Sequence, residues 1–278
     1  MIRIGFVDHR LGNFHANVFL QAFRGTLASR STVAGCFALD ANDGRAWAEK
    51  NGVKWCDSVA TMNDRVDAFM ILAPSNPELH WQLCEMALPL GKATYVDKTF
   101  APDLATAERI FALADQHQTP VQTTSALRYT AAQALVRQQP PGAVKHMIAW
   151  GGGSSFGEYA IHPVELLVSC MGSEATSLLR RGMSDYSQLL INFTGNRTGV
   201  ANVYTAGDTP FAASVTTDKT TTLLTLDLDK IFLDTAAAVL DLFETGKPNV
   251  DRRESLMVRR ILDAAENPAA LQNFVSLE

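Results

Sequence analysis

Three residues with polar side chains end the apolar run at positions 94–99, which reads TYVDKT. The β-branched and aromatic residues predict a buried strand, and Asp97, Lys98 and Thr99 complete it. A lysine in that place either extends its ammonium group into solvent or lies in a crevice beside partners. In a crevice it can donate a proton or a hydrogen bond to a reacting oxygen. Lys98 is therefore a candidate catalytic residue, and a solvated loop lysine is the alternative.

A glutamate and a histidine form a second candidate. Glu158 and His162 lie four residues apart in GEYAIHPVELLVSCMG, ahead of an amphipathic helix. A histidine can exchange protons near neutral pH, and a neighbouring carboxylate can orient its ring. A structural histidine at a helix start is the alternative, and the spacing alone leaves both interpretations open.

The elements that must position these residues follow a repeating pattern over the first 125 residues. Longer amphipathic stretches alternate with five short apolar runs: IRIGFVD, TVAGCFALD, DAFMILA, ATYVD and PVQTTS. Repeated strand–helix units predict a parallel sheet with helices on both faces. We therefore expect an α/β domain of the Rossmann, dinucleotide-binding type over residues 1–125.

The pattern changes near PPG at residues 140–142. Beyond it, alternating threonine-rich runs are joined by glycine and asparagine turns, and two helices close the chain. This predicts an α+β domain with an open, mainly antiparallel sheet over residues 126–278. If helices cover one face, the other meets water or another copy, where Leu224, Leu226 and Leu228 favour burial. We expect a homo-oligomer, a dimer or tetramer, built on that sheet.

Composition excludes several classes of function. The net charge is −5 and no basic stripe is present, which argues against nucleic-acid and membrane-surface partners. The four cysteines lie far apart, which argues against a disulfide framework or a zinc site and favours a reducing, cytoplasmic compartment. We expect neither a signal peptide nor a membrane span, because no run of about 18 apolar residues occurs. The expected partner is a small molecule.

Acidic residues end two other predicted strands, at Asp8 and Asp40. In an open α/β sheet, ligands bind outside the carboxyl ends of the strands. At the end of the second strand, an aspartate can bind the adenosine ribose of a dinucleotide and repel the 2′-phosphate of NADP. An ordinary helix cap is the alternative for Asp40.

Several segments together resemble the Gfo/Idh/MocA oxidoreductases, the family of glucose–fructose oxidoreductase and inositol dehydrogenase. The main segment is DAFMILAPSNPELHWQLCEMALPLGKATYVDKTFAPDLATAERI, which is similar to the family signature of an apolar strand, T-P-N, H, A-L-x-x-G-K and E-K-P. The resemblance extends over almost the whole chain through SALRY, Glu158-x-x-x-His162 and the closing FETGKPNVDRRESLMVRRILDAA.

The resemblance implies a Rossmann domain and a second sheet that lines the substrate site and forms a subunit interface. It also implies interconversion of a hydroxyl and a ketone on a sugar or polyol with NAD or NADP, and Asp40 favours NAD. Lys98 would hydrogen-bond the reacting oxygen, His162 would act as acid or base, and Glu158 would hold or assist it. The residues expected near the cofactor are Asp8, Arg10, Gly12, Asn13, Asp40, Ala73, Pro74, Asn76, His80, Asp97 and Arg128.

The chain departs from the family pattern in its first turn, which reads DHRLGNFHA and keeps only Gly12 of G-x-G-x-x-G. Asp8 replaces the first glycine, and a carboxylate about 5 Å from a phosphate costs on the order of 3 kcal/mol at an effective dielectric constant of about 20. We expect either an altered dinucleotide site, in which Arg10 offsets this charge, or loss of the usual cofactor. Thr99 replaces the family's proline, and the intrinsic preference of a non-proline peptide predicts a trans Lys98–Thr99 bond.

Three functions follow from these patterns. An NAD(P)-dependent oxidoreductase acting on a sugar or polyol is the leading prediction. A non-redox lyase or hydratase of the same fold could use Lys98 and His162 for proton transfer on a keto-sugar, and the altered first turn favours it. A catalytically silent sensor of a sugar or nucleotide is the third, which the retention of Lys98, Glu158 and His162 disfavours.

Overall fold

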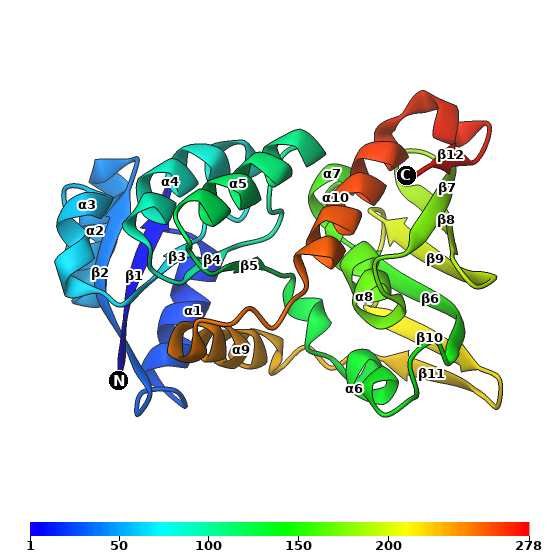
Figure 1. Cartoon of the computed structure of the whole chain (residues 1–278), viewed down its shortest axis with the longest axis horizontal. Helices are drawn as coiled ribbons and strands as arrows, with labels where there is room; N and C mark the ends of the chain where they lie inside the picture. Colours follow the sequence, from blue (N-terminus) through cyan, green and yellow to red (C-terminus); the bar gives the residue numbers. More distant parts are fainter. Residues whose placement is uncertain (278) are drawn as a thin grey trace. The chain divides into compact units, whose positions relative to one another are not determined.

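The computed structural model describes residues 1–277 and shows two compact units (Figure 1). The first unit comprises residues 1–124 together with 232–251, and the second comprises residues 125–231 together with the segment from Arg252. The sequence division placed all residues after 125 in the second domain. The segment 232–251 instead lies in the first unit, because its apolar residues join that unit's core.

The first unit is built on a five-stranded sheet in the order β2-β1-β3-β4-β5, and every strand pair in it is parallel. This confirms the predicted Rossmann-type sheet. Because β2 and β3 flank β1 on opposite sides, the sheet grows in both directions from β1, and ligands of such folds bind at this reversal. The strands are β1 (Ile2–Asp8), β2 (Ser31–Ala38), β3 (Ala68–Ile71), β4 (Thr94–Val96) and β5 (Val121–Thr123).

Helices cover both faces of this sheet. Ile4 and Phe6 of β1 share a core with Phe19 of α1 and Leu240 of α9, and Figure 1 shows α4 and α5 on the opposite side of the strands. The α-helices are α1 (Phe14–Arg24), α2 (Ala41–Asn51), α3 (Val59–Met62), α4 (His80–Ala87), α5 (Leu104–Gln116) and α9 (Ile231–Thr245). Short 3₁₀ helices are η1 (Asn63–Arg65), η2 (Pro77–Leu79) and η3 (Leu88–Leu90).

The second unit contains a seven-stranded sheet in the order β11-β10-β6-β9-β8-β7-β12. Among the described pairs of this second sheet, only β6 and β9 run parallel, so the predicted open, mainly antiparallel sheet is confirmed. The strands are β6 (Val144–Gly152), β7 (Ala175–Arg181), β8 (Tyr186–Phe193), β9 (Arg197–Tyr204), β10 (Ala212–Thr217), β11 (Thr221–Thr225) and β12 (Val275–Ser276).

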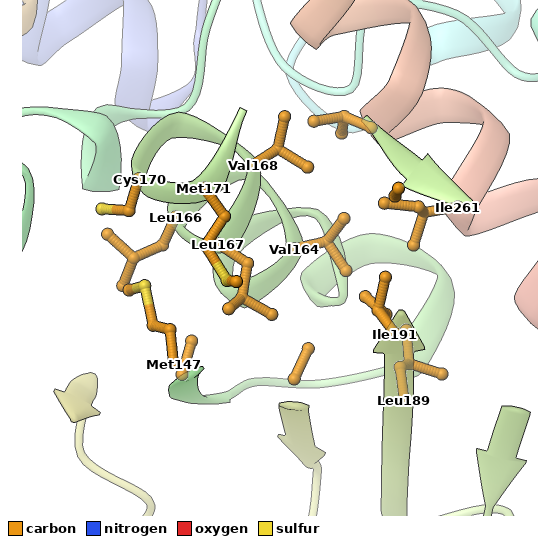
Figure 2. Packing of buried hydrophobic residues seen from close by; sticks show 14 of the residues in the cluster. Met147, Val164, Leu166, Leu167, Val168, Cys170, Met171, Leu189, Ile191 and Ile261 are labelled. Carbon is orange, nitrogen blue, oxygen red and sulfur yellow. The ribbon is translucent and has the colours of Figure 1, made fainter. Parts of the chain in front are cut away.

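Helix α8 lies at the centre of this unit's core. Figure 2 shows Val164 and Leu167 of α8 near Met147 and Ile191 of the sheet and Ile261 of α10, and all five side chains are fully buried or nearly so. The helices are η4 (Ala126–Arg128), α6 (Ala131–Arg137), α7 (Phe156–Tyr159), α8 (Ile161–Met171), α10 (Arg252–Glu266) and η5 (Pro268–Leu271). Across residues 1–277, no helix has the length and apolar character needed to span a membrane.

Two of the three leucines expected on an oligomer face lie elsewhere. Leu226 is buried in the core of the second unit and Leu224 packs against that core, so the assignment of these two residues to a subunit interface was wrong. They were chosen by strand alternation, which does not show which face the helices cover. Ile148 and Trp150 alternate along β6 with the core residue Ala149 and therefore lie on the opposite face.

Candidate functional site

The carboxyl ends of three neighbouring strands bring polar residues together in the first unit. β1 ends at Asp8, β3 is followed by Ala73 and Pro74, and β4 is followed by Asp97 and Lys98. The Ala73 N–H donates to Asp8 Oδ1 over 3.1 Å, and Lys98 Nζ donates to the Pro74 carbonyl over 3.3 Å. The predicted strand-end residues therefore form one connected group.

Lys98 is buried, with 7% of its surface exposed, so it is not a solvated loop lysine. The Lys98–Thr99 peptide bond is cis, and the prediction of a trans bond was wrong. That prediction used the intrinsic preference of a non-proline peptide and left out the tertiary contacts of this loop. The Lys98 N–H donates to Asp97 Oδ1 over 2.8 Å, and the carbonyl of Phe100 lies 3.0 Å from Nδ1 of His80.

Asp97 is buried and forms hydrogen bonds with three donors of the first unit. Its Oδ2 lies 2.5 Å from Nδ1 of His15, and its Oδ1 accepts the Tyr95 hydroxyl over 3.2 Å as well as the Lys98 N–H. Burial is the largest single effect and would raise the pKa of Asp97, but the charges and hydrogen bonds of His15 and Lys98 together outweigh it and hold the pKa below its ordinary value. Because an ionised carboxylate only accepts hydrogen bonds, Nδ1 of His15 carries a proton.

His15 was not among the predicted site residues. It lies in the first turn of α1, close behind the altered first turn, and that position was the only signal available in the sequence. Its contact with Asp97 joins residues 82 positions apart.

Asp8 lies at the end of β1 inside a set of hydrogen-bond donors. Its Oδ1 accepts the N–H groups of Arg10 and Ala73, each over 3.1 Å, and its Oδ2 accepts Nδ2 of Asn13 over 2.9 Å. Only 1% of its surface is exposed. Burial raises the pKa of Asp8 to about 7, although these hydrogen bonds oppose the rise.

Arg10 pairs with Asp40. Its Nε and Nη2 each lie 3.1 Å from Asp40 Oδ2, while Asp40 Oδ1 caps α2 by accepting the Asp43 N–H over 3.2 Å. The hydrogen bond from Asp43 and the charge of Arg10 hold the pKa of Asp40 below its ordinary value, against a smaller opposing effect of burial. Asp40 therefore caps a helix and binds an arginine, whereas in the described residues Arg10 reaches Asp8 only through its backbone N–H.

Gly12 and Asn13 form the start of α1. The Gly12 N–H donates to Asp43 Oδ2 over 3.0 Å, and a Cβ atom on Gly12 would lie 2.7 Å from Asp43 Oδ1. A side chain at position 12 would therefore displace this carboxylate. Asn13 Oδ1 caps the helix by accepting the Ala16 N–H over 3.0 Å.

Asn76 and His80 lie on the segment that follows β3. The Asn76 side chain donates to Glu78 over 2.9 Å. His80 is fully buried, with Nε2 2.8 Å from the Leu72 carbonyl and Nδ1 3.0 Å from the Phe100 carbonyl. His80 thus connects the end of β3 to the loop that carries Lys98.

His162 lies in the first turn of α8, in the second unit. Its Nδ1 is 2.8 Å from the hydroxyl of Ser125, which the sequence analysis did not select. The Ser125 N–H donates to Glu165 over 2.7 Å, so the serine is itself fixed to α8. Glu158, predicted to hold His162, accepts a hydrogen bond from Ser154 over 3.1 Å.

Arg128 is buried in the second unit between two carboxylates. Its Nε lies 3.1 Å from Glu165, and its Nη1 lies 2.7 Å from Glu254. These ion pairs attach η4 to α8 and α10. Within residues 1–277, no group of three or more histidine, cysteine, aspartate or glutamate side chains is arranged to hold a metal ion.

A parallel sheet with polar strand ends at its reversal point, followed by an open mixed sheet, defines a Rossmann-domain enzyme fold with a second α+β domain. Residues 2–125 match the family model GFO_IDH_MocA, described as an oxidoreductase family with an NAD-binding Rossmann fold. This confirms the family resemblance in the first domain, which matches the Gfo/Idh/MocA oxidoreductases. No curated protein sequence matches the chain significantly.

Solved structures share the fold over the whole chain. A putative myo-inositol dehydrogenase from Sinorhizobium meliloti is 13% identical, with a TM-score of 0.85 and full coverage of both chains. GenD2 from gentamicin A biosynthesis, solved with NAD, is 16% identical with a TM-score of 0.81, covering 100% of this chain and 97% of that one. UDP-N-acetylglucosamine 3-dehydrogenase from Acidithiobacillus ferrooxidans is 16% identical with a TM-score of 0.77, covering 95% of each chain. At these identities the likeness establishes the fold.

The residues of the first unit fit a dinucleotide. Asp40 lies two residues after β2, where the fold binds an adenosine ribose, and Gly12 lies just before α1, where it binds a pyrophosphate. Arg10 is exposed and can turn toward a phosphate. The fit requires an exchange of partners, because Gly12 and Arg10 already contact Asp43 and Asp40.

Proposed function

We propose that the protein is an NAD(P)-dependent oxidoreductase that interconverts a hydroxyl and a keto group on a sugar, a polyol or a related compound. The observation that carries this proposal is the buried Lys98 beside the ionised Asp97, at the carboxyl edge of a sheet whose family binds NAD. Dehydrogenases of inositol and of UDP-N-acetylglucosamine among the structural neighbours support the substrate class. Asp40 favours NAD over NADP.

Lys98 supplies the hydrogen bond to the reacting oxygen in this proposal. Its backbone N–H donates to Asp97 and its ammonium group donates to the Pro74 carbonyl, so the Lys98 side chain is oriented at both of its ends. A bound nicotinamide would supply the hydride acceptor or donor. His162, with Nδ1 held by Ser125, exchanges a proton through Nε2, and Glu158 assists; these assignments rest on the family resemblance.

Titration of the purified protein with NADH and NADPH, followed by turnover assays on a panel of polyols and keto-sugars, tests the proposal. We expect tighter binding of NADH than of NADPH and Lys98-dependent oxidation of at least one polyol. If the protein binds neither NADH nor NADPH, the proposal is contradicted.

A non-redox lyase or hydratase that acts on a keto-sugar is the second candidate. The observation that favours it is the first turn, where Asp8 and Asp43 accept the backbone N–H groups of Arg10 and Gly12. Turnover of a keto-sugar that depends on Lys98, without any dinucleotide, would select this candidate.

A further inference from the structure

Three donors of the first turn are held by carboxylates of the chain itself. The Gly12 N–H donates to Asp43 over 3.0 Å, and the Arg10 N–H donates to Asp8 over 3.1 Å. The guanidinium group of Arg10 contacts Asp40 through two nitrogens, each at 3.1 Å. In a Rossmann fold, the backbone donors at the start of the first helix bind the pyrophosphate of the dinucleotide.

The contact between Asp43 and Gly12 is specified by the backbone. Only a residue without Cβ admits the carboxylate at this distance, since a Cβ atom on Gly12 would lie 2.7 Å from Asp43 Oδ1. The backbone of Asp43 is fixed in the first turn of α2, where its N–H donates to Asp40 over 3.2 Å. Its side chain is partly exposed, so the carboxylate can leave Gly12 by rotating into solvent.

We propose that Asp43 and Asp40 are internal competitors of the dinucleotide. Asp43 occupies the pyrophosphate position on the Gly12 N–H, Asp40 retains Arg10, and binding exchanges both carboxylates for phosphate oxygens. Carboxylate and phosphate compete because both are anions that accept the same N–H and guanidinium donors. The proposal rests on the proposed function, and it makes Asp43 a residue that lowers the affinity for dinucleotides.

Calorimetry on the full chain tests the proposal with two probes, ADP-ribose, which carries the pyrophosphate, and adenosine, which lacks it. Asp43→Ala should bind ADP-ribose about tenfold more tightly than the wild type. This factor corresponds to about 1.4 kcal/mol, because binding to the variant no longer has to break a charge-assisted hydrogen bond between Asp43 and Gly12. The affinity for adenosine should not change. The matched control is Asp218→Ala, because Asp218 is an aspartate of the second unit whose side chain is 74% exposed.

Each other outcome is decisive. Equal affinity of Asp43→Ala and the wild type for ADP-ribose overturns the proposal, and weaker binding does so as well, because Asp43 would then be a ligand contact. An equal gain for adenosine overturns it, since the gain would not come from the pyrophosphate. If Asp43→Ala unfolds, Asp43→Asn, which keeps an acceptor without the charge, must still bind ADP-ribose more tightly. Failure of every variant and the wild type to bind ADP-ribose and NADH overturns the proposed function as well.

Discussion

The buried carboxyl of Asp8 makes the stability of the protein depend on pH. Burial raises the pKa of Asp8 from 3.8 to about 7 in the folded chain. The folded chain therefore holds this proton more tightly than the unfolded chain. Its stabilising effect is complete below pH 3.8 and is lost as the pH rises through about 7. At 1.36 kcal/mol for each pH unit of difference, the loss amounts to about 4 kcal/mol.

Asp8→Asn should remove this dependence, because the amide does not titrate. Its oxygen can accept the N–H groups of Arg10 and Ala73, but its NH₂ group would face the NH₂ group of Asn13. Asn13 cannot reverse its amide without losing the cap on Ala16. This mismatch lowers stability by about 1–3 kcal/mol at every pH, so the slope with pH is the informative quantity, not the absolute free energy.

Urea denaturation at pH 5, 6, 7 and 8 measures that slope. Between pH 5 and pH 8 the free energy of unfolding of the wild type should fall by roughly 3 kcal/mol more than that of Asp8→Asn. Asp218→Asn, on an exposed aspartate, should follow the wild type. Equal slopes for the wild type and Asp8→Asn would refute the argument that burial holds a proton on Asp8.

Lys98→Met should lower turnover at least 100-fold while the melting temperature stays within a few degrees. The control Lys145→Met, on an exposed lysine, should retain full activity. Substantial activity in Lys98→Met would show that Lys98 takes no part in the chemistry. His162→Asn should lower turnover by a similar factor. Ser125→Ala should change the tautomer of His162 that ¹⁵N NMR spectra report, and an unchanged spectrum would show that Ser125 does not orient the ring. If an oligomer is built on the face of the second sheet that carries Trp150, Trp150→Glu should convert it into monomers, as measured by light scattering. A wild-type protein that is monomeric at micromolar concentration would contradict the predicted assembly.

The strands of both sheets could be predicted where apolar runs are bounded by turn residues. The predicted strand IRIGFVD has the same bounds as β1, Ile2–Asp8. The segment ATSLLRR of β7 gives no strand pattern by itself, because it carries two arginines and only a short apolar stretch, and its pairing with β8 stabilises it as a strand. The location of Lys98 at a strand end also followed from local pattern, since a β-branched run ends there.

The partners of the site residues could not be predicted in the same way. Lys98 and Asp97 are adjacent in the sequence, but the contact of Asp97 with His15 depends on how α1 packs beside β4. The capture of the Gly12 N–H by Asp43 likewise depends on the distance between two helix starts. Ser125, whose hydroxyl lies 2.8 Å from Nδ1 of His162, is 37 residues away from it in the sequence. Local periodicity contains no information about such contacts.

The acids that depart from the family pattern each have several hydrogen-bond partners, and this bears on whether the site is functional. A buried polar or charged group without partners costs free energy, several kcal/mol in the case of an ion, so buried acids in a site that has lost its ligand are expected to lack partners. Asp97, shorter by one methylene than the family's glutamate, is buried yet accepts His15, Tyr95 and Lys98. Asp8, in place of a glycine, accepts three donors. Both acids therefore lie among hydrogen-bond donors, and Asp97 adjoins the buried Lys98, which supports an active enzyme with a rebuilt first turn over a silent sensor.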